Sequence, residues 1–363
     1  MRRLLGKRHL SGHELSRFEV FCNMVSCVLI QGRSELSQMA KGQTDRKQYA
    51  SKIKQFKRWL LHEKTDYKTY YLPYIVALLA CLSRSGLLVF SIDGSVVGKG
   101  CMCLMVSVIY RDKAIPVIWQ TYKAKKGHLS ESKHRGLLAN LAKLVPQDCR
   151  VVMTGDGEFD GCDWQADLLA LDWDYVLKTS KNTWITDENG DSFKAGYTLP
   201  DAGKSIYFEQ VEFTKKRYLT NLLVWQGKGF KHPLYLVTNL DYSPMIKQLY
   251  KKRFKIEPFF RDQKSGGFHI HKSGLRDPKR LDKLLIATCM PYVMCIMAAT
   301  KACCSKFYAE FVRTDADLLG LFQIGYCFIL FLVDIRQWRA FSIEKDLKPQ
   351  LNQLGQLDIC VPL

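Results

Sequence analysis

The 363-residue sequence predicts an α/β fold built on a mixed sheet, with helical segments at both ends. Three strand-like apolar runs follow one another: GLLVFSID at 86–93, CMCLMVSVIY at 101–110 and AIPVIWQTYKA at 114–124. Helix and strand patterns then alternate, with helices at 131–145 and 163–171 and strands at 149–156 and 173–180. This succession is typical of a mixed sheet covered by helices. Hydrophobic residues make up 47% of the chain, enough for one large core with appendages or for two domains.

The segments around this central part differ from it in pattern. Residues 10–30 and 47–82 carry apolar side chains at three- and four-residue spacing with many Lys and Arg between them, which predicts amphipathic helices. Between 182 and 240, turn-forming clusters separate strand-like runs, which predicts a small antiparallel insertion. From 244 the pattern is helical again to about 303, and a last helix is predicted over 315–340.

One apolar stretch, DLLGLFQIGYCFILFLVD at 317–334, invites comparison with a membrane span. It contains Gln323 and two glycines and is bounded by Asp317 and Asp334. Its apolar part is shorter than the ~20 residues that a span requires. We therefore expect a helix that is buried in the protein or serves dimerisation, and no membrane partner.

The chain is strongly basic, and its charge is concentrated in two places. The formal net charge is +19 at pH 7, and residues 1–68 hold 15 Lys and Arg against 6 Asp and Glu. Residues 244–283 hold 12 Lys and Arg against 4 Asp and Glu, while the rest of the chain is nearly neutral. Two local basic patches favour a nucleic-acid partner over general solubility or a membrane surface.

The cysteine pattern indicates a reduced, cytosolic protein. There are 13 cysteines, without a CxxC pair and without a signal peptide, which argues against a disulfide framework. Cys101 and Cys103 share one face of a predicted strand, as core residues do. His269 and His271 lack cysteine partners at zinc-ligand spacing, so a structural zinc site is not expected.

Two aspartates occupy matching positions after apolar strands. Asp93 closes a predicted strand in SIDGS, and Asp156 closes another in TGDGEFDG, each followed by glycine. Carboxylates at strand ends of an open α/β sheet are placed to meet a ligand. The alternative is a turn aspartate before glycine. DGEFDGCDWQAD also loosely resembles an EF-hand calcium loop, but Glu158 and Asp163 stand where that loop has other residues.

A third carboxylate lies in the basic segment YKKRFKIEPFFRDQK at 250–264. On a single helix, four side chains with polar or charged ends project within a sector of about 60°: Tyr250, Arg253, Glu257 and Lys264. Arg261 falls close by, so one face carries a carboxylate flanked by cations and a phenol, which suits phosphodiester chemistry. The alternative is a salt-bridged helix face that pairs Arg253 with Glu257. Pro258 disfavours helical geometry at Glu257, so we expect the helix to kink there or to begin after it.

The spacing Tyr-x2-Arg-x3-Glu-x6-Lys, with two aspartates upstream, resembles the DDE transposases of bacterial insertion sequences. It is similar to their cut-and-paste group with a Tyr-Arg-Glu-Lys signature, over about 90–300. The resemblance implies a ribonuclease H-like core interrupted by a β-rich insertion before the glutamate helix. We therefore expect a helical, basic DNA-end-binding region at 1–84, the core at 85–181 and 242–303, the insertion at 182–241 and a helical C-terminal region at 304–363.

The resemblance also implies a chemistry. Asp93, Asp156 and Glu257 would be the catalytic residues and the ligands of two Mg²⁺ ions, for which Mn²⁺ can substitute. Water would first attack the phosphodiester at the end of the element, and the freed 3′-hydroxyl would then attack target DNA. The ends would pass through a hairpin with one base flipped out and held by an aromatic side chain.

Further DNA contacts are implied for three groups of side chains. Phosphates would be held by Tyr250, Arg253, Lys264 and Arg261. The DNA backbone would meet the basic segment TYKAKKGH, unless it is a solvated loop, through Lys123, Lys125 and Lys126. The flipped base would stack on one of two aromatics that are otherwise strand-core residues, Trp225 or Tyr235. The implied partners are double-stranded DNA, as terminal inverted repeats and target, and a second copy of the chain in a homodimer, in the bacterial cytoplasm at the nucleoid.

Two other functions stay open at this point. A nuclease of the same fold would need the three carboxylates but not the Tyr-Arg-Lys face or the insertion, and it would hydrolyse nucleic acid without strand transfer. An inactive transposase relic would still bind DNA ends, and replacement of Glu257 would leave its activities unchanged.

Overall fold

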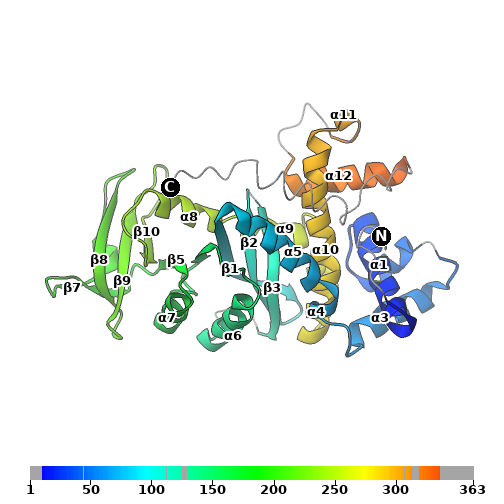
Figure 1. The fold of residues 1–363 in the computed structure, drawn as a ribbon, viewed down its shortest axis with the longest axis horizontal. Coiled ribbons are helices and arrows are strands. Elements are labelled where there is room, and N and C mark those ends of the chain that lie inside the picture. The colour runs from blue at the N-terminus through cyan, green and yellow to red at the C-terminus, as the bar shows by residue number, and fades with distance from the viewer. Residues whose placement is uncertain are drawn as a thin grey trace.

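A ten-stranded mixed sheet organises the computed structural model, which describes residues 10–43, 45–111, 113–124, 129–305, 307–312 and 319–335. The strands lie in the order β3-β2-β1-β4-β5-β10-β9-β8-β6-β7. Figure 1 shows the sheet extending from the middle of the molecule to β8 and β9 at one end, with the N-terminal helices at the other. The predicted fold class, a mixed α/β sheet with a β-rich insertion and helical parts at both ends, is confirmed.

The first half of the sheet is mixed in direction. Its strands are β1 (Leu87–Gly98), β2 (Cys101–Tyr110), β3 (Lys113–Lys123), β4 (Arg150–Gly155) and β5 (Asp174–Thr179). β1, β2 and β3 pair antiparallel as consecutive strands, whereas β4 pairs parallel with β1 and with β5. β2 is buried on both faces, which explains why its sequence is apolar except for Ser107.

The second half of the sheet is antiparallel throughout. Its strands are β6 (Trp184–Thr186), β7 (Ser192–Lys194), β8 (Ser205–Phe213), β9 (Tyr218–Trp225) and β10 (Leu234–Thr238). β10 pairs antiparallel with β5, with Thr238 opposite Val176, so these strands continue the core sheet and do not form a separate one. A 3₁₀ turn at Ala195–Tyr197 follows β7. The boundaries expected for the insertion stay a prediction, since one sheet runs through both parts.

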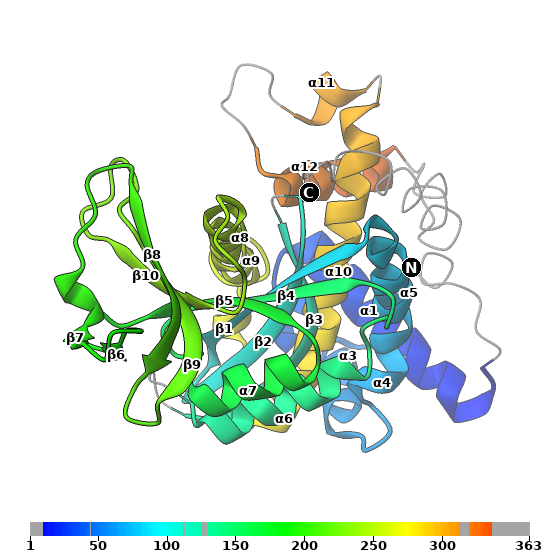
Figure 2. The same cartoon turned by 60° about the vertical axis from the view of Figure 1, so that its left-hand side comes forward.

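Helices cover both faces of the core strands (Figure 2). One face carries α6 (Glu131–Ala142) and α7 (Cys162–Ala170), and the other carries α8 (Met245–Arg253) and α9 (Ile256–Gln263). Side chains alternate between the two faces along each strand. Val89, Val152 and Val176 therefore form a separate buried cluster with Ile246 and Leu249 of α8. This cluster fixes α8 over β1, β4 and β5.

α10 (Pro278–Cys303) is the central helix of the helical part. In the part of the chain that the structure describes, it is the helix long and apolar enough to cross a membrane by length and composition, and 89% of its apolar window is buried inside the protein. Its neighbours include α1 (Gly12–Gln31), α3 (Tyr49–Leu61), α4 (Tyr67–Tyr70) and α12 (Leu321–Asp334). It therefore serves as a core helix. Shorter helices complete the set: α2 (Leu36–Gly42), α5 (Leu72–Leu82) with a 3₁₀ turn at Ser83–Ser85, and α11 (Tyr308–Phe311).

An aromatic cluster holds the N-terminal helices together. The ring of Phe21 on α1 stacks on Trp59 of α3 with centroids 5.7 Å apart, and both meet Tyr70 of α4 at 5.3 Å. The indole N–H of Trp59 donates to the carbonyl oxygen of Arg17 at 3.0 Å. The predicted amphipathic helices thus bury their apolar faces against one another and against α10.

Two predicted helical stretches are interrupted in the structure. In 47–82, α3 ends at Leu61 and α4 starts at Tyr67, where the carboxylate of Asp66 caps the new helix by accepting the N–H of Thr69 at 2.7 Å. After α9, the chain leaves helical geometry before α10 begins, with only a 3₁₀ turn at Ile270–Lys272. The last helix begins at Leu321, later than expected, and the end predicted for it lies outside the described residues.

Replacement of Gly325 with alanine tests how closely α12 packs on α10. A Cβ at this position would overlap the carbonyl oxygen of Cys295. We expect Gly325→Ala to lower the free energy of unfolding by about 2 kcal/mol or more, measured by urea unfolding with tryptophan fluorescence. Gly136→Ala on α6 is the control, because its Cβ would meet open space, and it should stabilise by about 0.5–1 kcal/mol. Equal unfolding midpoints for Gly325→Ala and the parent would contradict the packing.

Candidate active site

The register of the sheet places Asp93 beside Asp156. β1 pairs parallel with β4 up to Ser91 opposite Thr154, and each aspartate stands two residues further along its segment. Asp156 follows the last residue of β4, as predicted. Asp93, however, lies inside β1, so the prediction that it ends a strand is wrong: β1 continues to Gly98 because it still pairs with β2. The end of the β1–β4 pairing brings the two carboxylates to the same place.

The third carboxylate comes from the junction of α8 and α9. The single helix assumed for 250–264 is wrong, because α8 ends at Arg253 and two residues precede α9. These residues, Phe254 and Lys255, keep right-handed helical dihedral angles. Glu257 therefore still follows Arg253 by about one helical turn, and the two side chains meet.

Pro258 occupies the first turn of α9. Helix N–H groups in the first turn have no intrahelical acceptor, so the missing amide of proline costs no hydrogen bond there. The expectation that the helix kinks at Glu257 or begins after it is wrong, because α9 begins one residue earlier, at Ile256, and the break lies upstream of it. The N–H of Glu257 donates to the carbonyl oxygen of Phe254 at 3.3 Å, which links the first turn of α9 to the residues that follow α8.

The guanidinium of Arg253 contacts all three candidate acids. Its Nη1 lies 2.7 Å from Oε1 of Glu257, and its Nη2 lies 3.5 Å from Oδ2 of Asp93 and 3.5 Å from Oδ2 of Asp156. Because both Oδ2 atoms lie 3.5 Å from the same nitrogen, Oδ2 of Asp93 and Oδ2 of Asp156 are separated by no more than twice 3.5 Å. The Oγ of buried Ser91 donates to the carbonyl oxygen of Arg253 at 3.3 Å, which fastens the end of α8 to β1. The structure thus brings the three acids together around one cation.

The acids differ in their exposure to solvent. The exposed fraction of the side chain is 55% for Glu257, 34% for Asp156 and 16% for Asp93. The pKa of Asp93 is raised to about 6, chiefly by burial; the Arg253 guanidinium opposes the rise and the Asp156 carboxylate adds to it. Ionised Asp93 therefore depends on a neighbouring cation to offset the cost of its burial.

The other predicted residues of the glutamate segment take different positions. Nζ of Lys264 donates to Oγ of Ser95 at 2.7 Å, two residues beyond Asp93 on β1. The side chain of Arg261 is 64% exposed on α9. Tyr250 is buried between α8 and the sheet, and burial raises the pKa of its phenol well above the usual range. Lys264 and Arg261 are therefore better placed than Tyr250 to meet a DNA phosphate.

The remaining DNA-binding candidates are spread over the sheet. Lys123 is exposed at the end of β3, while Lys125 and Lys126 lie outside the described residues. Trp225 at the end of β9 and Tyr235 in β10 are 7% and 6% exposed. A base can stack on either ring only after neighbouring side chains move.

One supporting residue was missed at the sequence level. In the sequence, Glu158 stands out only through the loose resemblance to an EF-hand loop. Its N–H donates to Oδ1 of Asp156 at 3.0 Å, and its buried carboxylate accepts the N–H of Leu129 and lies against His134. The signal in the sequence was an acid two residues after Asp156, but nothing in the spacing connects it to position 134.

The three acids suit a hard divalent cation in their donor type. Carboxylate oxygens are the ligands that Mg²⁺ and Mn²⁺ prefer, and here three of them face one cationic group. Among the described side chains, no group of three or more His, Cys, Asp and Glu residues is arranged to hold a metal ion as it stands. The guanidinium of Arg253 lies between the acids, so a metal ion would take over oxygens that now contact it.

Comparison with known families identifies the domain that carries these acids. The family described as Transposase DDE domain matches residues 88–294, a range that contains all three acids. The chain belongs to this DDE transposase family. Members of the family are enzymes of DNA transposition and generally use divalent metal ions. For this DDE transposase, the roles of Asp93, Asp156 and Glu257 in catalysis stay a prediction.

Solved structures and curated proteins add two findings. The cryo-EM structure of a piggyBac transposase synaptic complex with hairpin DNA is similar to this transposase, with a TM-score of 0.46 and 12% sequence identity, over 98% of this chain and 80% of that chain. A search of curated protein sequences gave no match. The range of the family match runs from β1 into α10, so it includes the antiparallel strands as well as the core strands.

Replacement of Asp93 with asparagine tests the electrostatics of the site. The folded pKa of about 6 exceeds the ordinary 3.8, so ionised Asp93 costs stability as pH rises through this window. The asparagine side chain keeps an oxygen that can accept the Gly94 N–H, now bonded to Asp93 at 2.7 Å, without the charge. We expect Asp93→Asn to gain stability over the parent between about pH 4 and 6, reaching on the order of 1–3 kcal/mol at pH 7.

Urea unfolding at several pH values measures this gain. Asp163→Asn is the control, because the pKa of Asp163 is shifted in the opposite direction. The hydrogen bond with Lys216 lowers the pKa of this exposed carboxyl, so the variant should not become more stable than the parent as the pH rises. A constant difference between Asp93→Asn and the parent from pH 4 to pH 7 would show that burial of the charge does not set the pKa of Asp93.

Proposed function

We propose that this DDE transposase moves a bacterial insertion sequence by cutting DNA at the ends of the element and joining them to target DNA. The observation that carries the proposal is the convergence of Asp93, Asp156 and Glu257 on Arg253 within the matched domain. The spacing of Tyr250, Arg253, Glu257 and Lys264 supports membership of the cut-and-paste group with the Tyr-Arg-Glu-Lys signature.

The three acids would supply the oxygen ligands for two Mg²⁺ ions, with Mn²⁺ as a substitute. Bound divalent ions lower the pKa of an attacking water or 3′-hydroxyl and stabilise charge on the leaving oxygen. The chain determines where this happens, because Asp93 is deepest in the sheet and Glu257 lies at the solvent side. Protons compete with a metal ion for Asp93, so ion binding should weaken as pH falls below about 6.

Arg253 would change partners when the acids bind metal ions. Its guanidinium would then lose the carboxylates that now pair with it. A phosphodiester can replace them, because its oxygens match the planar arrangement of the guanidinium N–H groups. Lys264 at the end of α9 and exposed Arg261 would add contacts to the same DNA strand. Tyr250 would support this face from below, because it is buried against the sheet.

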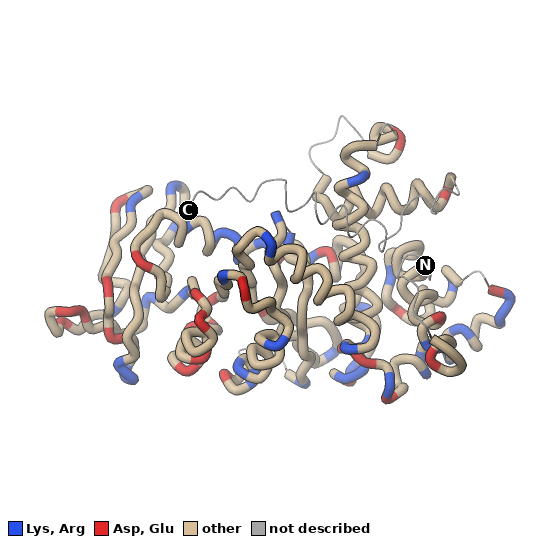
Figure 3. The backbone as a smooth tube through the Cα atoms, in the orientation of Figure 1, with Lys and Arg blue, Asp and Glu red and all other residues tan. Residues whose placement is uncertain are grey.

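The N-terminal helices offer a second basic surface, for the terminal repeats. A groove of about 400 Å³ lies along α1 and α3, and none of its lining residues is acidic. Its basic lining residues are Arg17, Lys47, Arg58 and His62. Figure 3 shows basic positions along α3 and along α8. Phosphates are the ligands that such a groove attracts.

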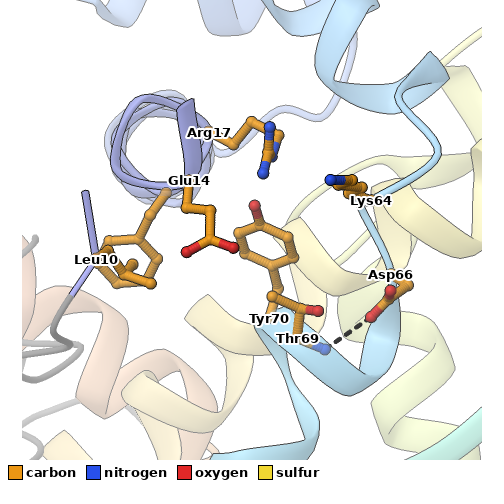
Figure 4. A pocket seen from close by; sticks show the side chains of 8 residues that line it. Leu10, Glu14, Arg17, Lys64, Asp66, Thr69 and Tyr70 are labelled. Atoms are coloured by element: carbon orange, nitrogen blue, oxygen red, sulfur yellow. Dashed lines mark hydrogen bonds between the residues drawn. The ribbon is translucent and has the colours of Figure 1, made fainter. Parts of the chain in front are cut away.

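A neighbouring cavity is less suited to DNA. It encloses about 290 Å³ beside the start of α1, where Figure 4 shows Glu14, Arg17, Lys64 and Asp66 around Tyr70. The two acids offset the two basic side chains in the lining, so a phosphate would gain little there. We therefore assign the contact with the repeats to the groove.

The proposal extends to the assembly and its place in the cell. Cutting both ends of an element together requires two active sites, which a homodimer would supply. The cut ends would pass through hairpins, and Trp225 or Tyr235 would hold a flipped base after its neighbours move. This chemistry would act on DNA in the bacterial cytoplasm, at the nucleoid.

Replacement of Glu257 with glutamine tests the catalytic proposal. The change keeps the size of a half-exposed side chain, so folding and DNA binding should stay close to the parent. We expect cleavage and strand transfer to fall by at least about 10²-fold, because a metal ligand is lost. The measurement is a gel assay in which the protein meets its own flanking genomic DNA, a target plasmid and Mg²⁺.

Glu212→Gln on β8 is the matched control, since this carboxylate pairs with Arg217 away from the site, and it should cut as the parent does. Parent products joined to the target support the transposase. Free nicks without joining would indicate a nuclease of the same fold, and a parent that binds ends but never cuts them would indicate an inactive relic.

Replacement of Arg253 with alanine should make stability depend on Mg²⁺. Removing the cation leaves three neighbouring acids without compensation, which should cost about 3 kcal/mol or more. Mg²⁺ should restore part of this loss and raise the melting temperature of Arg253→Ala more than that of the parent. Thermal unfolding with and without MgCl₂ measures the difference, with exposed Arg217→Ala as the control. An equal effect of Mg²⁺ on all three proteins would argue against metal binding at these acids.

A further inference from the structure

A buried carboxylate that the proposed chemistry does not use lies behind Asp156. Glu158 stands in the turn between β4 and α7, and its side chain is 9% exposed. Its Oε1 accepts the N–H of Leu129 at 2.6 Å and lies 3.3 Å from Nε2 of His134. Burial of a carboxylate costs free energy unless partners of this kind surround it. These partners therefore hold the Glu158 carboxylate in place next to the candidate site.

The turn connects Glu158 directly to a candidate metal ligand. The N–H of Glu158 donates to Oδ1 of Asp156 at 3.0 Å, while Oδ2 of the same carboxylate faces Nη2 of Arg253 at 3.5 Å. Oδ1 of Asp156 is thus held by the backbone of the turn, and Oδ2 points toward the guanidinium that the three acids share. Rotation of the Asp156 side chain would break the hydrogen bond, so the place of Glu158 sets the direction of Oδ2.

The far end of this connection is fixed in the core. His134 lies on α6 and its side chain is 2% exposed. Its ring packs against Phe159 with centroids 4.7 Å apart and against Trp164 at 6.2 Å. Because the imidazole has little freedom to move, the Glu158 oxygen beside it is fixed as well, and α6 is linked through Glu158 to Asp156.

We propose that Glu158 is a positioning residue for Asp156. Held by Leu129 and His134, its carboxylate keeps the turn in place so that Asp156 presents Oδ2 to the cation that the three acids share. The inference rests on the proposed function, because it assumes that this cation is a divalent metal ion during catalysis. Groups that orient metal ligands from behind typically contribute 10–100-fold to metal affinity or activity.

Glu158→Gln tests the proposal on the full chain. We expect the dissociation constant for Mn²⁺, measured by isothermal titration calorimetry without DNA, to rise about 10-fold, with a matching rise in the Mg²⁺ concentration for half-maximal cleavage. Glu131→Gln is the matched control, since its carboxylate accepts the N–H of Trp164 at 2.9 Å at the start of α7. This control should keep the Mn²⁺ affinity of the parent even if both variants lose similar stability.

A second pair of variants covers the case in which Glu158→Gln does not fold. His134→Gln keeps a side-chain N–H for Glu158 and should stay within about twofold of the parent in Mn²⁺ affinity, whereas His134→Leu lacks this donor and should weaken binding about as much as Glu158→Gln. Mn²⁺ affinities that are unchanged in Glu158→Gln and His134→Leu, or lowered equally in Glu131→Gln, overturn the positioning role while the proposed function stands. A parent that neither binds Mn²⁺ nor cuts DNA overturns both proposals.

Discussion

The charge compensation of three carboxylates by the guanidinium of Arg253 is the constraint on which the site depends. Asp93, Asp156 and Glu257 come from a strand, a turn and a helix junction, and their like charges would repel one another without a cation between them. Two contacts of the surrounding elements support this arrangement. The parallel pairing of β1 with β4 aligns the two aspartates, and Ser91 fastens the end of α8 above them.

The surrounding fold supplies the rigidity that such a site needs. Acids crowded into one place lower the stability of a protein, and natural proteins offset such local costs elsewhere in the structure. Here the offset comes from extensive apolar burial, in the valine cluster beneath α8 and along α10, where every residue from Leu284 to Ala299 is buried. The result is a rigid sheet that carries a small, crowded group of charges near its surface.

The sequence predicted those parts of the fold that depend on local patterns. Strand alternation, the succession of strands and helices, and the meeting of Arg253 with Glu257 all follow from short-range periodicity. The break between α8 and α9 was signalled by Pro258 but placed too far along the chain, because proline fits the first turn of a helix without cost. The extension of β1 past Asp93 depends on β2 as a partner, which periodicity alone does not reveal.

In the candidate site, too, contacts between segments that are distant along the chain do not follow from periodicity. The three acids could be chosen from their contexts in the sequence, and the resemblance to a family joined them into one proposal. The contact between Glu158 and His134, however, arises only when α6 packs beside the turn after β4. The burial of Trp225 and Tyr235, by contrast, agrees with the alternative interpretation of both aromatics as strand-core residues.

The pairing of β10 with β5 has a consequence for how such a chain can change in length. If the strands from β6 to β10 were cut out, β5 would become a bare edge with a row of unsatisfied N–H and C=O groups, which is a template for aggregation. We therefore expect insertions and deletions to be tolerated best at the outer hairpin ends, such as the turn between β6 and β7, where no neighbouring strand loses its partner. The segment that looks along the sequence like a removable insertion therefore covers, through β10, the edge of the strands that carry the candidate site.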